Sequence, residues 1–106
     1  MPKFLYKVNL SAEGTRGTLK EGGVARRNAI AELAKSLGGS LEAFYYAFGE
    51  TDAYVIVDVP DAETAAATAI AVSLSGTGSI ETVVLLDPEQ VDAIAAKTIN
   101  YRPPGG

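Results

Sequence analysis

The sequence lacks three residue types entirely, since its 106 residues include no cysteine, no histidine and no tryptophan. Without cysteine the chain can form neither a disulfide nor a thiolate site for zinc or an iron–sulfur cluster. Without histidine it offers no imidazole to activate a serine or cysteine nucleophile and no proximal ligand for haem. Carboxylates alone could bind a hard metal, and they do not follow the spacing of an EF-hand loop. We therefore expect no cofactor and no metal site.

Excess basic charge and long apolar runs are also missing. The formal net charge is −4, and an acidic domain without a basic stripe is a poor partner for the phosphates of nucleic acid. The longest uncharged stretch, 64–80, is rich in alanine, serine and threonine, and the first residues lack the apolar core of a signal peptide. We therefore expect one cytoplasmic domain that binds neither nucleic acid nor a membrane.

The chain does contain short segments with clear periodicity. Alternating apolar residues, and runs rich in aromatic and β-branched residues, predict strands at 4–10, 41–48, 53–59 and 80–86. Apolar residues at helical spacing predict helices at 24–37 and 62–75.

Signals at the ends of these segments complete the prediction. Asp61 is a suitable N-cap for helix 62–75, and Asp87, Pro88 and Gln90 form a capping-box sequence for a third helix ending near residue 97. The segment 11–23 contains four glycines and is predicted to be a loop with one irregular helical turn.

The order β-α-β-β-α-β with an appended helix is that of the ferredoxin-like split βαβ arrangement. It predicts an α+β domain over residues 1–97, with a four-stranded antiparallel sheet and both main helices on one face. Residues 98–106 are predicted to form an extended tail, since "NYRPPGG" favours polyproline-like backbone.

The face of this sheet away from the helices is too apolar to meet water, because strand 41–48 is largely apolar on both sides. The simplest cover is the same face of a second copy, related by a two-fold axis. We therefore expect a dimeric α/β barrel. Helix 62–75 carries no charge after Glu63, which favours either close packing on its own sheet or contact with another subunit.

Four stretches that span almost the whole chain resemble the GYD-domain family of small bacterial proteins, which is named for a Gly-Tyr-Asp motif. They are "MPKFLYKV", "KEGGVARRNAIAELAKSLGGSLEAFYYAFGETDAYVIVDVPD", "VVLLDPEQVDAI" and "YRPPGG". The resemblance implies a dimeric α/β barrel of ferredoxin-like fold. At the motif this chain has Gly49-Glu50-Thr51-Asp52, so threonine stands in the tyrosine place and an activity needing that phenol is not expected.

The open face supplies the candidate ligand-binding and catalytic residues. Asp58 lies within a predicted strand, where a buried carboxylate needs a partner, and Lys7 is the expected partner. The carboxylate is either a general acid/base with a pKa shifted by burial, one half of a structural ion pair, or an edge charge that reaches water near Pro60. With an odd-length hairpin loop, the candidate ligand-binding residues on this face are Lys7, Asn9, Phe44, Tyr46, Phe48 and Tyr54.

Two further features have a structural and a functional interpretation. Gly49 and Asp52 of the family motif are expected to shape the hairpin, the aspartate by accepting backbone N–H groups, with direct ligand binding as the alternative. The glycine-rich segment before Arg26 and Arg27 is either a solvated loop or an anion site at a helix start.

Three functions are compatible with the sequence. The first is a homo-oligomer, a dimer or larger, that binds a small molecule between its sheets. The second is a cofactor-independent oxygenase or isomerase, which the resemblance permits because dimeric α/β barrels include such enzymes. The third is an assembly protein whose barrel interior is filled by its own side chains.

Overall fold

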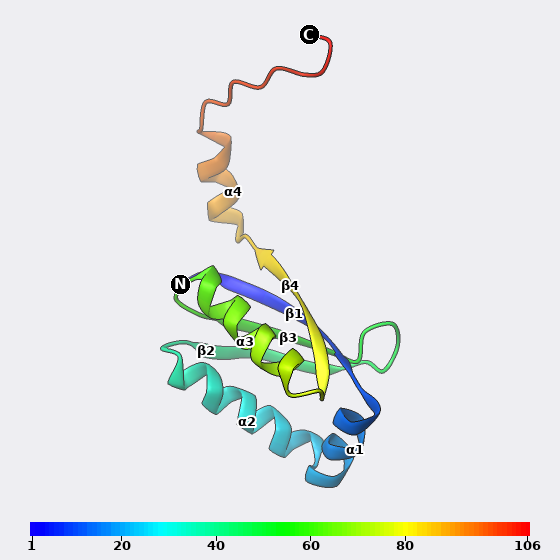
Figure 1. The fold of residues 1–106 in the computed structure, drawn as a ribbon. Coiled ribbons are helices and arrows are strands. Elements are labelled where there is room, and N and C mark those ends of the chain that lie inside the picture. The colour runs from blue at the N-terminus through cyan, green and yellow to red at the C-terminus, as the bar shows by residue number, and fades with distance from the viewer.

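The computed structural model describes residues 1–106 and contains one four-stranded antiparallel sheet with four helices (Figure 1). The strands are β1 (Lys3–Leu10), β2 (Ser40–Tyr46), β3 (Ala53–Asp58) and β4 (Gly78–Leu85), in the sheet order β2-β3-β1-β4. The helices are α1 (Ala12–Glu21), α2 (Gly23–Ser36), α3 (Ala62–Leu74) and α4 (Pro88–Ala95). This α+β architecture is compatible with the ferredoxin-like fold and confirms that part of the prediction.

Two of the helix starts follow the signals in the sequence. Asp61 accepts a hydrogen bond from the backbone N–H of Thr64 at 2.8 Å, and its bonds to Thr64 hold the pKa of Asp61 below its ordinary value. Asp87 and Gln90 form a complete capping box at the start of α4. Both predicted caps are confirmed, because each side chain satisfies backbone N–H groups that have no partner inside the helix.

The prediction of a loop at 11–23 is wrong, because residues 12–21 form α1. The Ser11 hydroxyl caps this helix by accepting a hydrogen bond from the N–H of Gly14 at 3.0 Å. Gly14 is needed for a close approach rather than for a turn, since an added Cβ would lie 1.9 Å from the carbonyl oxygen of Thr77. Gly22, at φ 105°, then separates α1 from α2.

The core lies between the sheet and the helices α2 and α3, which cover the same face of the sheet (Figure 1). Phe4 and Tyr6 from β1 and Val55 and Val57 from β3 alternate toward these helices and are buried. The Tyr6 hydroxyl donates a hydrogen bond of 2.9 Å to the carbonyl oxygen of Ala65 in α3. Burial raises the pKa of the Tyr6 phenol, because the charged form would lose its hydration.

Strand β2 contains a β-bulge that changes which side chains share a face. Leu41 pairs with Val57 and Ala43 with Ile56, so Glu42 is an extra residue without a partner on β3. After the bulge, Phe44 pairs with Val55 and Tyr46 with Ala53, both of which face the helices.

The hairpin between β2 and β3 has an even loop of six residues, 47–52. The predicted odd loop is therefore wrong. A shift of one residue moves every side chain of a strand to the other face, so Phe44 and Tyr46 lie on the helix side and not on the open face.

The chain after β4 leaves the body of the molecule. Helix α4 and residues 96–106 project away from the sheet and the other helices (Figure 1). We call residues 86–101 the C-terminal arm. Every residue of the arm is exposed, including Val91, Ile94, Ile99 and Tyr101. None of the four helices is long and apolar enough to cross a membrane.

Candidate functional site

A cavity of about 120 Å³ lies between the sheet and the helices α2 and α3. Of the 19 residues that line it, 15 are hydrophobic. Its floor is the sheet, with Tyr6, Val55 and Val57, and its walls include Ile30 of α2 and Val72 of α3. The cavity is partly open because α2 and α3 each pack on the sheet more than on one another. Such a space is suited to a small apolar group.

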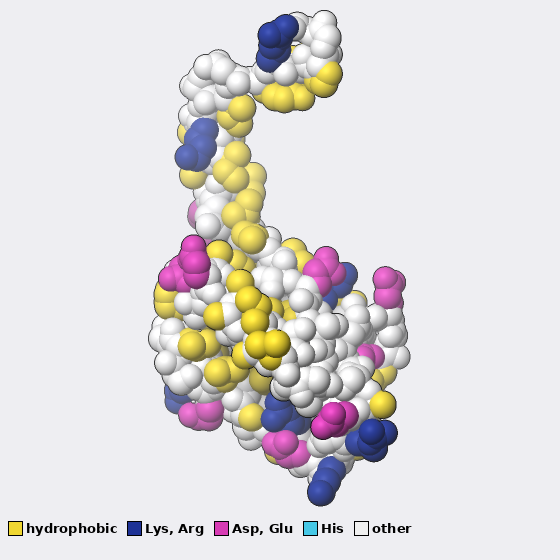
Figure 2. Space-filling model, in the orientation of Figure 1, with side chains coloured by type: hydrophobic (Ala, Val, Ile, Leu, Met, Phe, Trp, Pro, Cys, Tyr) yellow, Lys and Arg dark blue, Asp and Glu magenta, His cyan; other side chains and the backbone are white.

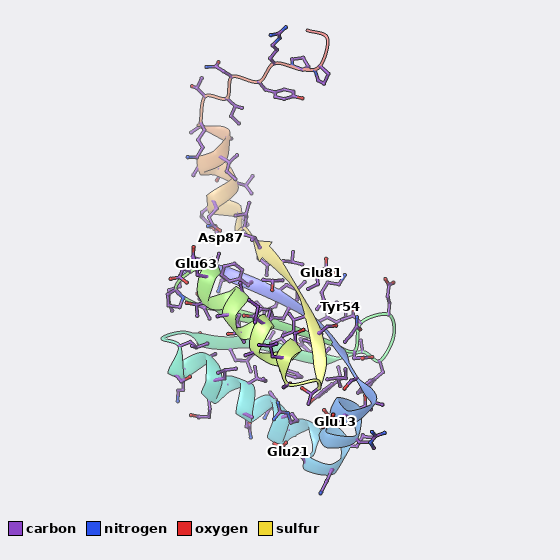
Figure 3. All side chains as sticks on the ribbon, viewed as in Figure 1. Glu13, Glu21, Tyr54, Glu63, Glu81 and Asp87 are labelled. Carbon is purple, nitrogen blue, oxygen red and sulfur yellow. The ribbon has the colours of Figure 1, made fainter.

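The lining contains only four residues that are not hydrophobic, namely Thr18, Arg26, Thr68 and Thr77. All three threonine hydroxyls are already bonded. Thr18 donates to the Gly14 carbonyl at 2.9 Å, Thr68 donates to the Thr64 carbonyl at 3.1 Å, and the Thr77 hydroxyl lies 2.7 Å from that of Ser75. Arg26, in the first turn of α2, is the only charged residue of the lining. Its guanidinium lies 3.5 Å from the carboxylate of Glu21 at the end of α1, a residue labelled in Figure 3.

Aromatic side chains of β2 form one side of this cavity, and one from the hairpin stacks on them. The rings of Phe44 and Tyr46 lie 5.0 Å apart at 60°, and Phe48 stacks on Tyr46 at 5.6 Å with nearly parallel rings. The Tyr46 hydroxyl donates a hydrogen bond of 3.2 Å to the Gly23 carbonyl. Burial raises the pKa of this phenol, and the charge of Arg26 opposes part of the rise.

Three of the candidates predicted for the open face therefore lie together on the helix side of the sheet or beside it. Phe44 and Tyr46 line the cavity beneath the helices, and Phe48 stacks on Tyr46. The prediction that these three share a face with Tyr54 is wrong. The cause is the even hairpin loop, which pairs Tyr46 with Ala53 and Phe44 with Val55. The sequence predicts Arg26 only as part of an anion-binding loop, and it contains no signal for the position of Arg26 in an apolar cavity.

The open face carries the remaining candidates. Lys7 pairs across the strands with Tyr54, and both alternate away from the buried face, as does Asn9. Figure 3 shows Tyr54 and Glu81 on the side of β4 away from α3. Tyr45 pairs with Tyr54 on this face and is not expected there, because an odd hairpin loop would place it on the helix side.

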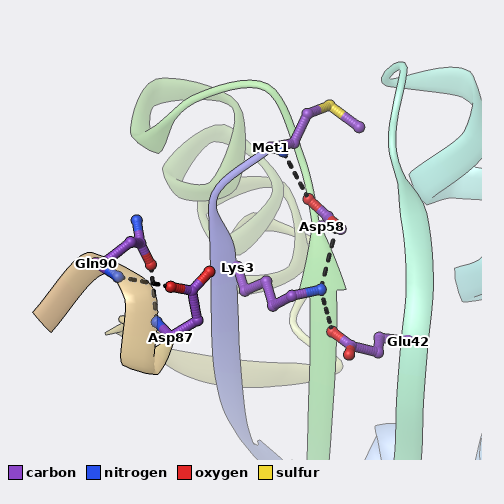
Figure 4. A network of polar contacts seen from close by, with 6 residues as sticks. All are labelled: Met1, Lys3, Glu42, Asp58, Asp87 and Gln90. Carbon is purple, nitrogen blue, oxygen red and sulfur yellow. Dashed lines mark hydrogen bonds and ion pairs between the residues drawn. The ribbon is translucent and has the colours of Figure 1, made fainter. Parts of the chain in front are cut away.

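Asp58 ends β3 on the open face, where it is held by amino groups (Figure 4). One carboxylate oxygen lies 3.3 Å from the Lys3 ammonium, and the other lies 3.8 Å from the Met1 nitrogen and has no hydrogen-bond partner although it is buried. Lys3 also bonds to Glu42 at 2.8 Å, and its bonds to Glu42 and Asp58 raise the pKa of Lys3.

The predicted pairing of Asp58 with Lys7 is wrong. Lys3 stands directly opposite Asp58 in the sheet, whereas Lys7 lies 3.6 Å from the carboxylate of Glu81 on β4. The arrangement at Asp58 is that of an ion pair at the end of a strand. Catalysis by Asp58 stays a prediction.

At the family motif, Asp52 has a clear structural role. Its carboxylate accepts a hydrogen bond from the backbone N–H of Leu10 at 2.8 Å, and its N–H donates to the Val8 carbonyl at 2.9 Å. The residue thus ties the hairpin to the end of β1. The only residue other than glycine with positive φ is Phe48, at 52°, and a Cβ added at Gly49 would meet nothing within 4 Å. Ligand binding by Gly49 or Asp52 stays a prediction.

The antiparallel sheet, the helices on one face and the aromatic hairpin define an α+β domain compatible with the ferredoxin-like class. The family model of the GYD domain matches residues 4–95 of the 106-residue chain, and the protein belongs to this family. No curated protein and no solved structure matches the chain. The matched region extends through α4, so this helix is part of the family domain.

Proposed function

We propose that this GYD-domain protein is a homo-oligomer that binds a small, largely apolar molecule in the cavity beneath α2 and α3. The observation that carries the proposal is the cavity itself, with its volume of about 120 Å³ and a lining in which 15 of 19 residues are hydrophobic. A dry apolar cavity of about 150 Å³ can hold benzene, so one compact ring is the appropriate size of ligand. Binding between two facing sheets, as the sequence predicts, needs the assembled dimer and stays a prediction.

The open face of the sheet supports assembly. It presents apolar Leu5, Ile56 and Val83 as half-buried residues and the rings of Tyr45 and Tyr54 as exposed ones. Its ion pairs carry both signs of charge, so two copies of this face can meet without a net clash of like charges. A two-fold axis would place the two apolar faces together and give the predicted dimeric barrel.

The C-terminal arm supports the same conclusion. Its helix belongs to the family domain yet makes almost no contact with its own chain, while Val91 and Ile94 are exposed. Figure 2 shows hydrophobic side chains in a band that runs from the arm onto the body near α3, where Ile70 and Leu74 are exposed. A second copy of the chain is the partner we propose for this band, because the arm continues directly from β4 at the edge of the open face.

Ligand binding can be tested by titrating toluene into the protein and following backbone amide shifts. We expect saturable shifts at residues of the cavity floor such as Val55 and an increase of the melting temperature. Val72→Phe should fill the cavity and abolish binding, whereas Ile70→Phe, on the exposed side of the same helix, should leave it intact. Shifts that do not saturate, or that persist in Val72→Phe, would contradict the proposal.

Assembly can be tested separately by light scattering at micromolar concentration. We expect a dimer or larger oligomer for the natural chain and a monomer for Ile56→Lys, which adds a charge to the apolar part of the open face. Glu32→Lys, on an exposed position of α2, makes a charge change at an unrelated place and should not alter the oligomer. A monomer in the natural chain would overturn the oligomeric part of the proposal.

A further inference from the structure

The cavity beneath α2 and α3 combines an apolar lining with one fixed positive charge. Arg26 is the only charged residue among the 19 that line it, and no carboxylate is part of the lining. A cavity that served only to hold a hydrocarbon would need no cation. The question is therefore which ligand would use both the apolar space and the guanidinium.

We infer that the ligand is a compact aromatic acid, whose ring lies against Phe44 and Tyr46 and whose carboxylate binds Arg26. The inference rests on the proposed function, since it concerns the ligand of the same cavity. It assigns Arg26 as the residue that selects an anion over neutral and cationic molecules of the same shape. It also assigns the aromatic side of the cavity as the surface that receives the ring.

The charges around Arg26 leave it available to an anion. The first turn of α2 contains no acidic residue, and it carries Arg27 as a second positive charge beside Arg26. The only carboxylate paired with Arg26 is that of Glu21, at 3.5 Å, and both side chains are more than a third exposed. Exposed pairs of this kind contribute little to stability, so a ligand can displace Glu21 at little cost.

The chemistry of the guanidinium favours a carboxylate. Its planar fork can donate two parallel hydrogen bonds to the two oxygens of one carboxylate, which a neutral amide or alcohol cannot accept in the same way. The cavity beside it excludes water from one side of that pair, which strengthens the attraction. The ligand's charged group therefore belongs at the Arg26 end and its apolar body farther in.

The dimensions and the aromatic side of the cavity define the body of the ligand. A volume of about 120 Å³ accommodates a single ring rather than a long acyl chain. The rings of Phe44 and Tyr46 meet at 60°, so one of them can offer its face and the other its edge to a third ring. The Tyr46 hydroxyl is already donated to Gly23, which leaves Arg26 as the group that fixes the ligand's orientation.

The test compares four probes by amide shifts at neutral pH and low salt: phenylacetate, phenylacetamide, phenethylammonium and acetate. Phenylacetate should bind about tenfold more tightly than its neutral isostere phenylacetamide, and phenethylammonium should bind more weakly than either. Acetate should give no saturable shift at the cavity, because it has no apolar body.

Three variants test whether Arg26 causes the preference for an anion. Arg26→Gln should reduce the affinity for phenylacetate about tenfold and leave that for phenylacetamide unchanged, while Arg26→Lys should recover part of the loss. Arg27→Gln is the matched control, since Arg27 is an exposed neighbour on the same turn that does not line the cavity. It should bind all four probes as the natural chain does.

The outcomes separate this inference from the proposed function. If phenylacetate and phenylacetamide bind equally, or if Arg26→Gln changes nothing, the ligand class is wrong while the cavity remains a binding site. Acetate binding as tightly as phenylacetate would also overturn the inference, because the cavity would then contribute nothing. If none of the aromatic probes binds, the proposed function itself fails.

Discussion

The two faces of the sheet are made by the same strands but have different neighbours. On the face beneath the helices, Phe4, Tyr6, Val55 and Val57 are only 2–4% exposed. On the open face, the intervening positions hold half-buried aliphatic residues, exposed tyrosines and ion pairs. Helices of the same chain thus bury one face, apart from a cavity of ligand size. The other face is suited to contact with another molecule.

The comparison shows that apolar character alone does not define a core. Val57 and Ile56 are adjacent and both aliphatic, yet the first is buried by helices and the second is only half-buried. A face that is buried by its own chain should contribute to the free energy of unfolding by an amount that does not depend on protein concentration. A face that is buried by a second copy should contribute an amount that rises with protein concentration.

The largest effect is expected for Val57→Ala. Removing two buried methyl groups and leaving a cavity should lower the free energy of unfolding by about 2–3 kcal/mol at every protein concentration. Ile56→Ala, the matched variant on the open face, should cost about 1 kcal/mol in the dilute protein and more as concentration rises. Urea unfolding at several concentrations measures both. Equal and concentration-independent losses would remove the distinction between the faces.

A slightly smaller effect is expected at the start of β2. A Cβ added at Gly39 would lie 2.0 Å from the Asp58 carbonyl oxygen, so Gly39→Ala should lower the free energy of unfolding by about 1–3 kcal/mol. Gly49→Ala, beyond the other end of the strand, meets no neighbouring atom within 4 Å and should change stability by less than about 0.5 kcal/mol. Thermal unfolding of both variants tests this, and a costly Gly49→Ala would show that the hairpin needs glycine.

Tyr6→Phe should cost about 1 kcal/mol at neutral pH, because it removes the hydrogen bond to the Ala65 carbonyl. The pKa of Tyr6 is raised above 10.0 in the folded chain, so the unfolded chain loses this proton first as the pH rises. The stability of the natural chain should therefore fall above pH 10, and the stability of Tyr6→Phe should fall less steeply. Urea unfolding between pH 7 and 11 measures the difference, with Tyr101→Phe in the exposed arm as the control.

The smallest effect is expected for Lys3→Met on the open face. The pKa of Lys3 is raised, so its ion pairs stabilise the fold at pH values below 10.5 and are lost as the pH rises through the folded pKa. Lys3 is partly exposed, and salt should screen the pairs, so the loss at low salt should disappear in high salt. A loss as large as that of Val57→Ala, or one insensitive to salt, would contradict this interpretation.

Much of the fold could be predicted because local signals agree with it. The strands, α2 and α3 follow from their periodicity, and the caps at Asp61 and Asp87 are present as expected. Helix α1 could not be predicted, because Gly14 and Gly17 are poor helix formers and suggest a loop. The reason for Gly14 lies in a tertiary contact with Thr77, which is far away in the sequence.

The candidate site was predicted less well, and the cause lies in two features of β2, the even hairpin loop and the bulge at Glu42. Alternation along β2 is interrupted at Glu42, so Leu41 and Phe44 share a face although three positions separate them. Nothing in the local sequence distinguishes a bulged residue from a regular one. The cavity depends in addition on the spacing of α2 and α3, which is a property of packing and not of either helix alone.

The bulge at Glu42 has a consequence for how the sheet can grow. β2 and β4 are the two edge strands, and an edge with free backbone groups can recruit further strands and lead to aggregation. The bulge disturbs the pairing pattern of β2 near its start, whereas β4 pairs with β1 in regular register along all eight of its residues. Addition of a further strand is therefore disfavoured at β2 and not at β4, so the sheet can extend at its β4 edge.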